Sequence, residues 1–258
     1  MIRTAVKIAY LGRHFSGSQI QPGLRTVEGD ILSDLRAITK MRDGDIDLKL
    51  ASRTDRGVNS LGNVAVFSSS INDPDVLMKA LNAVSEDVFY RGVAFVGGEF
   101  NPRFADKRSY RYVLRSDGMD LAAVRDCAGL FAGEHDFTRF CKPDGKSATL
   151  VLDPVVVREE DGLIVLDFSA RYFLWNMIRR ITAAVMSVGR GESSVSDVRD
   201  ALEGKDITFG LARPDALTLL DVRYEGVDFV SPSADVFGRR VDEEMFEDKL
   251  RNMFFTSL

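Results

Sequence analysis

Apolar and polar positions divide the first half of the chain into alternating strands and helices. Residues 2–11 alternate between the two kinds and are rich in β-forming side chains, which predicts a strand. Thr26 is a suitable N-cap, and apolar side chains recur after it at helical spacing from Val27 to Ile38. The other elements predicted in this half are strands at 46–52, 63–69 and 88–97 and a helix at 74–84, with Asp73-Pro74 as its start.

The second half of the chain repeats this order. Its first strand is predicted just after Arg108, and Gly162 marks a turn between its second and third strands. The elements predicted here are strands at 108–115, 150–159, 162–171 and 216–225 and helices at 121–131, 173–188, 195–202 and 241–253. Both halves therefore have the order β-α-β-β-α-β, with one extra helix and an amphipathic tail helix in the second half.

This repeated order predicts an α+β fold made of two ferredoxin-like halves, a topology that RNA-recognition motifs share. We expect residues 1–104 to form the N-terminal half and residues 105–258 the C-terminal half. Two such units can join edge to edge into one antiparallel sheet with a central cleft on its open face. The topology alone does not give a function.

The composition is that of an ordinary globular protein. The 258 residues are 45% hydrophobic and 28% charged, and no apolar run reaches the roughly 18–20 residues that span a bilayer. The N-terminus lacks the arrangement of a secretory signal. Cys127 and Cys141 are too few for a disulfide framework, so we expect a reducing, cytoplasmic location.

The charge is unevenly distributed along the chain. A net charge of −5 argues against binding to nucleic acid. However, residues 1–27 and 170–191 contain no acid, and residues 48–72 contain only Asp55. If these stretches converge, they form a local surface that attracts anions. The alternative is that the gaps reflect chance and buried strands.

Asp55 has an unusual setting. Arg53 precedes it by two residues, Arg56 follows it, and Gly57 breaks regular structure just beyond. A nearby cation favours an ionised carboxylate, which suits a nucleophile or an electrostatic stabiliser rather than a general acid. Taken alone, the same pattern also fits a surface Arg–Asp turn.

The wider stretch around Asp55 is Arg-Thr-Asp-Arg-Gly-Val-Asn-Ser-Leu-Gly-Asn-Val, residues 53–64. It resembles the signature of the tRNA pseudouridine synthase A family, Arg-Thr-Asp-Ala-Gly-Val-His-Ala-Leu-Gly-Gln-Val. The departures include Arg56 and Asn59, together with Ser18 in place of a usual tryptophan. The run at 173–175 resembles archaeal members of the family. The further segments that match, in the family's order, are Tyr10–Gly12, Phe15–Gln21, Thr26–Gly29, Phe100–Ala105, Arg108–Tyr112, Gly133–Phe140 and Phe173–Arg179.

The resemblance implies an enzyme that isomerises uridine to pseudouridine in the anticodon stem-loop of tRNA, around positions 38 to 40. It implies a homodimer, and it makes Asp55 the catalytic residue of the N-terminal half. Tyr110 corresponds to an aromatic residue that stacks on the target base, and Arg179 to a basic residue that pairs with the carboxylate. The reaction uses no oxidant, hydride or phosphate, so we expect no cofactor. The histidines and cysteines are too scattered for a zinc site.

Flipping a base into a pocket requires an apolar wall and cations on the flanking phosphates. Leu174, beside Phe173, is a candidate for the wall, although residues at helical spacing are more often core. Taken singly, Tyr110 also fits an ordinary strand tyrosine, Arg179 a solvated helix arginine, and each remaining arginine a surface residue. The arginines predicted to contact RNA are Arg13, Arg25, Arg53, Arg56, Arg103 and Arg108.

Two other functions compete with this interpretation. One is a non-catalytic RNA-binding protein of two recognition-motif-like halves, but the aromatic pattern of such sheets is absent from the sequence. The other is a glycosylase, which needs a second carboxylate such as Glu28 or Asp136 beside Asp55. Within the preferred interpretation, Asp55 can add to C6 of the uracil, add to C1′ of the ribose, or remove the C2′ proton.

Overall fold

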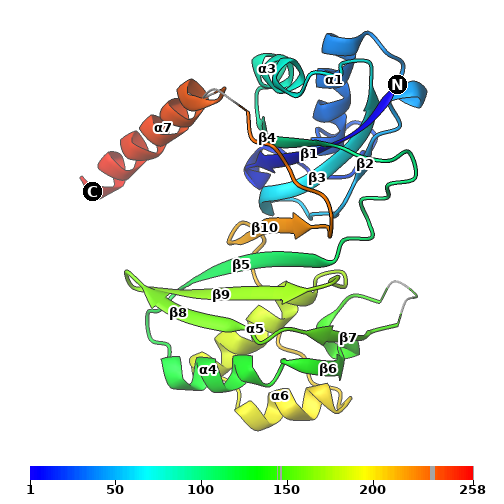
Figure 1. Cartoon of the computed structure of the whole chain (residues 1–258). Coiled ribbons are helices and arrows are strands. Elements are labelled where there is room, and N and C mark those ends of the chain that lie inside the picture. The colour runs from blue at the N-terminus through cyan, green and yellow to red at the C-terminus, as the bar shows by residue number, and fades with distance from the viewer. Residues whose placement is uncertain (144, 146, 233–235, 258) are drawn as a thin grey trace.

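One broad sheet of eight strands forms the centre of the molecule (Figure 1). The computed structural model describes residues 1–143, 145, 147–232 and 236–257. Along the sheet the order is β4-β1-β3-β10-β5-β9-β8, and β2 pairs with β3. The bounds of these strands are Ile2–Tyr10 for β1, Lys49–Leu50 for β2, Asn59–Ser69 for β3, Val88–Phe95 for β4, Lys107–Arg115 for β5, Val156–Glu160 for β8, Leu163–Ala170 for β9 and Leu217–Arg223 for β10.

The N-terminal half contains strands in the order β4-β1-β3-β2 and the helices α1 (Val27–Thr39), α2 (Asp43–Ile46) and α3 (Pro74–Val84). The predicted caps are confirmed. The Thr26 side chain accepts from the backbone N–H of Gly29, and the Asp73 side chain accepts from that of Val76. The apolar faces of α1 and α3 bury Ile31 and Leu77 against the strands in a core that belongs to this half.

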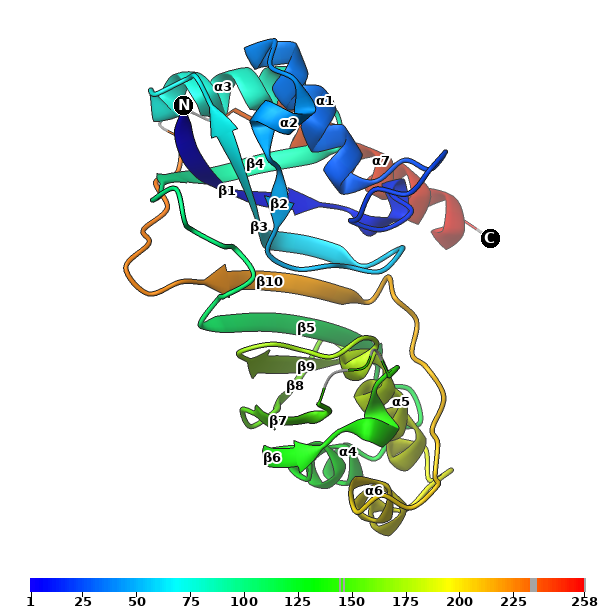
Figure 2. The same cartoon turned by 90° about the vertical axis from the view of Figure 1, so that its right-hand side faces the viewer.

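The C-terminal half has the corresponding order β10-β5-β9-β8. Its helices are α4 (Leu121–Gly129), α5 (Met177–Gly189) and α6 (Val195–Leu202), and a capping box at Ser194 begins α6. Figure 2 shows these helices at the opposite end of the sheet from α1, α2 and α3. A separate hairpin of β6 (Gly133–Asp136) and β7 (Thr149–Leu152) also belongs to this half, and the sequence pattern did not predict β6.

The halves join through β3 and β10, which run parallel and pair Asn59 with Thr218 and Ser60 with Leu219. The expectation of a sheet that is antiparallel throughout is therefore wrong at this pair. Strand β2 pairs only with Ala65 and Val66, so the first residues of β3 keep a free edge that β10 occupies. Gly62 permits this approach, because a Cβ there would lie 2.5 Å from the carbonyl oxygen of Leu220.

Helix α7 (Gly238–Thr256) projects from the N-terminal half and has no buried residue (Figures 1 and 2). Its attachment lies in its first turns. The Arg240 guanidinium donates to the carbonyls of Ser85 and Val88 and to the Asn82 side chain, and it lies over the Phe89 ring. No helix among the described residues is long and apolar enough to cross a membrane.

Three predicted elements differ from those observed. The strand at 46–52 is the end of α2 followed by the two residues of β2, and the strand at 150–159 is two strands that Asp153 and Pro154 separate. The helix predicted from Phe173 begins at Met177, because Asn176 adopts a left-handed conformation with φ of 62°. The irregular segments 51–58, after β2, and 171–176, before α5, border the region described next.

Candidate active site

Asp55 lies in the loop of residues 51–58, which connects β2 to β3 at the junction of the two halves. Its carbonyl accepts from the N–H of Val58 at 3.1 Å, closing a turn that contains Gly57. Gly57 has φ of +85°, and a Cβ there would lie 3.1 Å from the Pro214 ring. Glycine is therefore required twice over, by its backbone conformation and by a neighbour from the C-terminal half.

Buried hydrogen bonds fix the backbone of this loop. The fully buried Asn63 side chain accepts from the Ser52 N–H at 3.1 Å and donates to the Ser52 carbonyl at 2.9 Å. The Thr54 N–H donates to the Ser18 hydroxyl at 2.8 Å, and the Thr54 and Tyr10 hydroxyls are 2.9 Å apart. Because Thr54, directly before Asp55, and Ser52, three residues before it, are held in this way, the fold fixes the backbone from which the Asp55 side chain projects.

Arg179 brings the C-terminal half to Asp55. Its Nη1 lies 3.2 Å from Asp55 Oδ2, and its Nε donates to the Ala212 carbonyl at 2.7 Å. Nη1 also lies 3.4 Å from the side-chain oxygen of Asn176. The Arg179 side chain is 13% exposed and that of Asp55 37%, so the cation is buried while the carboxylate remains accessible. A largely buried guanidinium held by two further acceptors orients the Asp55 carboxylate.

Tyr110 lies on β5 and is 7% exposed. The Phe173 ring packs edge-on against it with centroids 5.1 Å apart, and Leu174 is buried beside Phe173 in the chain. Burial raises the pKa of the Tyr110 phenol to about 12, with a smaller opposing effect from the nearby Arg108 cation. The phenol is therefore neutral at physiological pH, and Tyr110 and Phe173 together form an aromatic pair, whereas Leu174 is part of the core.

The six predicted RNA-binding arginines fall into different environments. Arg53 and Arg56 are exposed, and no carboxylate among the described residues lies within ion-pair distance of either. Arg103 is also exposed. Arg108 is buried, which lowers its pKa, and it donates to the Ser52 hydroxyl and to the Ala51 carbonyl. Its guanidinium thus supports the Asp55 loop from below and does not face the solvent.

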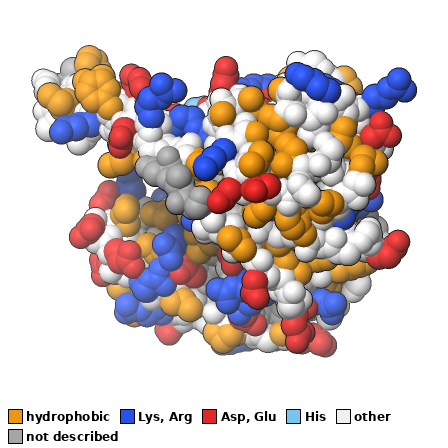
Figure 3. All heavy atoms as spheres, turned by 45° about the horizontal axis from the view of Figure 1, so that its top comes forward, with side chains coloured by type: hydrophobic (Ala, Val, Ile, Leu, Met, Phe, Trp, Pro, Cys, Tyr) orange, Lys and Arg blue, Asp and Glu red, His pale blue; other side chains and the backbone are white. Residues whose placement is uncertain are grey.

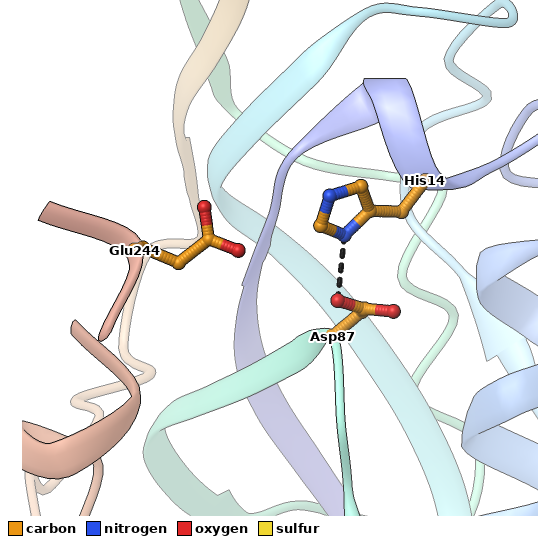
Figure 4. A group of neighbouring side chains, drawn as sticks. All are labelled: His14, Asp87 and Glu244. Carbon is orange, nitrogen blue, oxygen red and sulfur yellow. Dashed lines mark hydrogen bonds and ion pairs between the residues drawn. The ribbon is translucent and has the colours of Figure 1, made fainter. Parts of the chain in front are cut away.

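Arg13 and Arg25 lie where α7 meets the N-terminal half. There His14, Asp87 and Glu244 form the one group in the described chain with spacing that could hold a metal ion (Figure 4). However, Arg13 pairs with Glu244 and donates to His14 Nε2, while Arg25 pairs with Asp87 at 2.7 Å. These guanidinium groups already neutralise the carboxylates, so the group is an ionic clamp on α7.

The three acid-poor stretches of the sequence meet at Asp55. Ser18 of the first stretch accepts from the N–H of Thr54 in the second stretch, and Arg179 of the third stretch pairs with Asp55, also in the second. The expected convergence is therefore observed. Figure 3 shows a hollow below the start of α7, with Lys and Arg side chains on its wall and acidic side chains scattered more widely.

Comparison with known proteins agrees with this geometry. A family model described as tRNA pseudouridine synthase matches residues 127–225. The tRNA pseudouridine synthase A of Pyrococcus abyssi is 38% identical and covers 98% of this chain and 97% of its own length. The chain belongs to the tRNA pseudouridine synthase A family. The resemblance inferred from the sequence is confirmed, as is the class of enzyme, an isomerase.

Other relatives of this family member are also archaeal. The tRNA pseudouridine synthase A of Pyrococcus furiosus is 37% identical over 94% of this chain and 92% of its own length, and that of Archaeoglobus fulgidus is 33% identical over 97% and 93%. Among solved structures, a Cbf5–Nop10–Gar1 complex matches 71% of this chain and 45% of that chain, at 13% identity and a TM-score of 0.35. Nothing about function follows from a likeness of that size.

The departures from the family signature have structural partners that the sequence did not reveal. Ser18 stands in place of the usual tryptophan and is 1% exposed, because its hydroxyl and N–H both bond to Thr54. Asn59 replaces the usual histidine. It accepts from the Gly12 N–H and donates to the Asp215 carbonyl, each at 2.9 Å, and so ties both sides of the site together. Arg56 stays exposed.

Proposed function

We propose that this chain isomerises uridine to pseudouridine in the anticodon stem-loop of tRNA, around positions 38 to 40, with ionised Asp55 as the nucleophile or base. One observation carries the proposal. The accessible Asp55 carboxylate is held by the buried Arg179 cation at the junction of the halves, 3.2 Å away. The names of the archaeal relatives, tRNA pseudouridine synthase A, support tRNA as the substrate.

The reaction breaks the bond between N1 and C1′, rotates the uracil and forms a bond from C5 to C1′. Attack at C6, attack at C1′ and removal of the C2′ proton all require an unprotonated carboxylate, and the Arg179 ion pair holds the Asp55 carboxylate in position. The target base must leave its stack before a protein side chain can reach this bond. Tyr110 and Phe173 supply the surface against which the flipped base packs, with Tyr110 as a neutral phenol, whereas Leu174 is buried in the core.

Exposed arginines beside the site supply contacts to the RNA backbone. Arg53 and Arg56 flank Asp55 in the loop, and Arg103 lies beside the Arg108 guanidinium, which donates to its carbonyl. We assign these three to flanking phosphates. Arg108 is assigned to the support of the loop, and Arg13 and Arg25 primarily to the clamp on α7, at one margin of the bound RNA.

The proposal extends to architecture and setting. Residues 1–104 and 105–258 are assigned as two ferredoxin-like halves, which the matching strand orders β4-β1-β3-β2 and β10-β5-β9-β8 support. A homodimer and a cytoplasmic location complete the proposal. The first is checked by light scattering of the purified chain, and the second by fractionation of the source cells.

The decisive experiment compares wild type with Asp55→Asn on an unmodified tRNA transcript, mapping pseudouridine by position. Wild type is expected to form pseudouridine in the anticodon stem-loop without added metal or nucleotide. The variant keeps the size of the side chain but removes its charge, so it is expected to bind the tRNA and to lose at least about 1,000-fold in rate.

Asp136→Asn is the matched control, because this carboxylate is exposed and its oxygen is bonded to Thr138 in another part of the C-terminal half. It is expected to react at the wild-type rate. Binding without pseudouridine formation by wild type on any tRNA would replace the enzyme with a binding module. Release of free uracil would instead indicate a glycosylase.

A further inference from the structure

The segment between β9 and α5 carries an exposed aromatic pair that the proposed reaction does not use. Residues 171–176 lack regular structure, and Phe173 from this segment packs on Tyr110. Leu174 points into the core at 8% exposure, whereas Tyr172 and Trp175 are 43% and 46% exposed. Both rings are therefore accessible to a ligand on the segment that also carries Phe173.

Trp175 is fixed in place although it is exposed. The backbone N–H of Lys142 donates to the Trp175 carbonyl at 2.8 Å, and the Lys142 ammonium lies 3.8 Å from the centre of the indole ring. The Tyr172 hydroxyl donates to the Thr149 carbonyl at 3.3 Å, so this ring is held from the same loop region. A ring whose orientation is set before binding loses little entropy when a second ring stacks on it.

A short path of contacts connects Trp175 to the reacting carboxylate. Its neighbour Asn176 is the left-handed residue before α5, and the Asn176 side chain lies 3.4 Å from Nη1 of Arg179. The same Nη1 is 3.2 Å from Asp55. Trp175 is therefore the direct neighbour of a residue that contacts the Arg179–Asp55 pair, and we place it at the margin of the reaction site.

We propose that Trp175, braced by Lys142 and flanked by Tyr172, is a stacking platform for the RNA base adjacent to the flipped uridine. The inference rests on the proposed function and adds a second base-binding position to it. The ligand is an unpaired ribonucleotide, because every base has a π-face and the surrounding charge is positive. Lys142 belongs to this platform, and residues 170–191 contain four arginines and no acid.

Stacking at this position has a mechanistic consequence. Flipping one base removes its stacking on the next base, and the exposed neighbour then loses contact area on one side. An indole that replaces the missing base stabilises the flipped state and not the stacked state of the RNA. Trp175 is thus a positioning residue, and its loss affects the affinity for the flipped substrate more than the chemical step at Asp55.

Trp175 is the single tryptophan in the sequence, so intrinsic tryptophan fluorescence reports on this position alone. We would titrate Asp55→Asn protein with an anticodon stem-loop RNA, and with matched RNAs that are abasic on the 5′ or the 3′ side of the target. The intact RNA is expected to quench the emission and to protect it from acrylamide. One of the two abasic RNAs is expected to bind without quenching. Equal emission with and without saturating intact RNA would overturn the proposal.

Mutation supplies the second measurement. Trp175→Ala is expected to raise the dissociation constant for the stem-loop about 5- to 150-fold, whereas Trp175→Phe retains most of the affinity. In single-turnover assays at saturating enzyme the Trp175→Ala rate is expected to stay within about threefold of wild type. Phe95→Ala is the matched control, since this β4 side chain is 44% exposed at the far edge of the sheet and should leave binding unchanged.

The two proposals fail separately. If wild type forms no pseudouridine, the proposed function fails whatever the fluorescence does. If wild type forms pseudouridine but Trp175→Ala binds as tightly as wild type and both abasic RNAs quench fully, only the platform fails.

Discussion

The two halves share a strand order but differ in which connection is long. In the N-terminal half, the connection before the third strand is the loop of residues 51–58, which carries Asp55. In the C-terminal half the corresponding connection is only Asp161 and Gly162, with φ of 50° and 74°, as in the tight turn that favours twisted hairpins. The order of elements alone therefore does not place a site.

The connection after the third strand is short in the N-terminal half and longer in the C-terminal half, which is the reverse of the connection before it. In the N-terminal half residues 70–73 lead directly into α3, whereas in the C-terminal half residues 171–176 carry Phe173 and Trp175 before α5 begins. Each half thus has one long connection, residues 51–58 in the N-terminal half and residues 171–176 in the C-terminal half. The parallel pairing of β3 with β10 brings these two connections together. The comparison teaches that the Asp55 carboxylate and the Arg179 cation that holds it come from different halves, joined only by the tertiary structure.

Among the tests of this comparison, the largest effect is expected from removing the Arg179 side chain, which the C-terminal half contributes to the Asp55 pair. Arg179→Ala removes the cation from Asp55 and leaves the Ala212 carbonyl without its donor. We expect kcat to fall about 100- to 1,000-fold, with Arg179→Lys intermediate because an ammonium cannot serve all three acceptors. The rate of pseudouridine formation in single-turnover assays measures the loss for both variants. Arg190→Ala, exposed at the other end of α5, is the control, and a loss below threefold for Arg179→Ala would show that the pair is not functional.

The unequal connections also predict unequal costs in stability. Asn63→Ala leaves the N–H and the carbonyl of Ser52 buried without partners beneath the long loop, so we expect a loss of about 2–4 kcal/mol in the free energy of unfolding. Asp161→Ala alters only the two-residue turn of the other half, where a non-glycine residue already has positive φ, and we expect a loss of less than about 1 kcal/mol. Urea denaturation measures the free energy of unfolding of both variants, and equal losses for Asn63→Ala and Asp161→Ala would contradict this prediction.

A smaller, pH-dependent effect distinguishes the first strands of the two halves. Burial raises the pKa of Tyr110 on β5 from 10.0 to about 12, so the unfolded chain loses this proton first as the pH rises. The contribution to stability is complete below pH 10 and is lost between pH 10 and 12, by about 2–3 kcal/mol. Burial also raises the pKa of Tyr10 on β1, but hydrogen bonds from Thr54 and Asn63 oppose this rise.

The test is the urea midpoint of wild type, Tyr110→Phe and Tyr10→Phe between pH 8 and 12. Tyr110→Phe is expected to reduce the alkaline loss of stability, and Tyr10→Phe to lower stability already at pH 8 because it removes a hydrogen bond to the loop. Identical slopes for wild type and Tyr110→Phe above pH 10 would contradict the assignment.

The sequence by itself determined most of the regular structure. The helical spacing after Thr26 and the Asp73-Pro74 start each correspond to an observed helix, because the side-chain cap and the apolar spacing are both local in the sequence. The tail pattern also corresponds to a helix, although α7 buries no residue. Where the predictions were wrong, distant residues decide the backbone. Helix α5 begins after Asn176 because the preceding segment packs on Tyr110, and β2 is short because β10 takes the next part of the edge of β3.

The same division holds for the site. A lone acid among arginines and the match to a family signature were visible in the sequence and selected Asp55, Tyr110 and Arg179. Only the tertiary structure decided that Arg179 lies 3.2 Å from Asp55, that Arg108 is buried under the loop, and that Ser18 and Asn63 hold its backbone. The physical reason is that residue type and spacing set charge and local conformation, whereas burial and pairing depend on which strands share an edge.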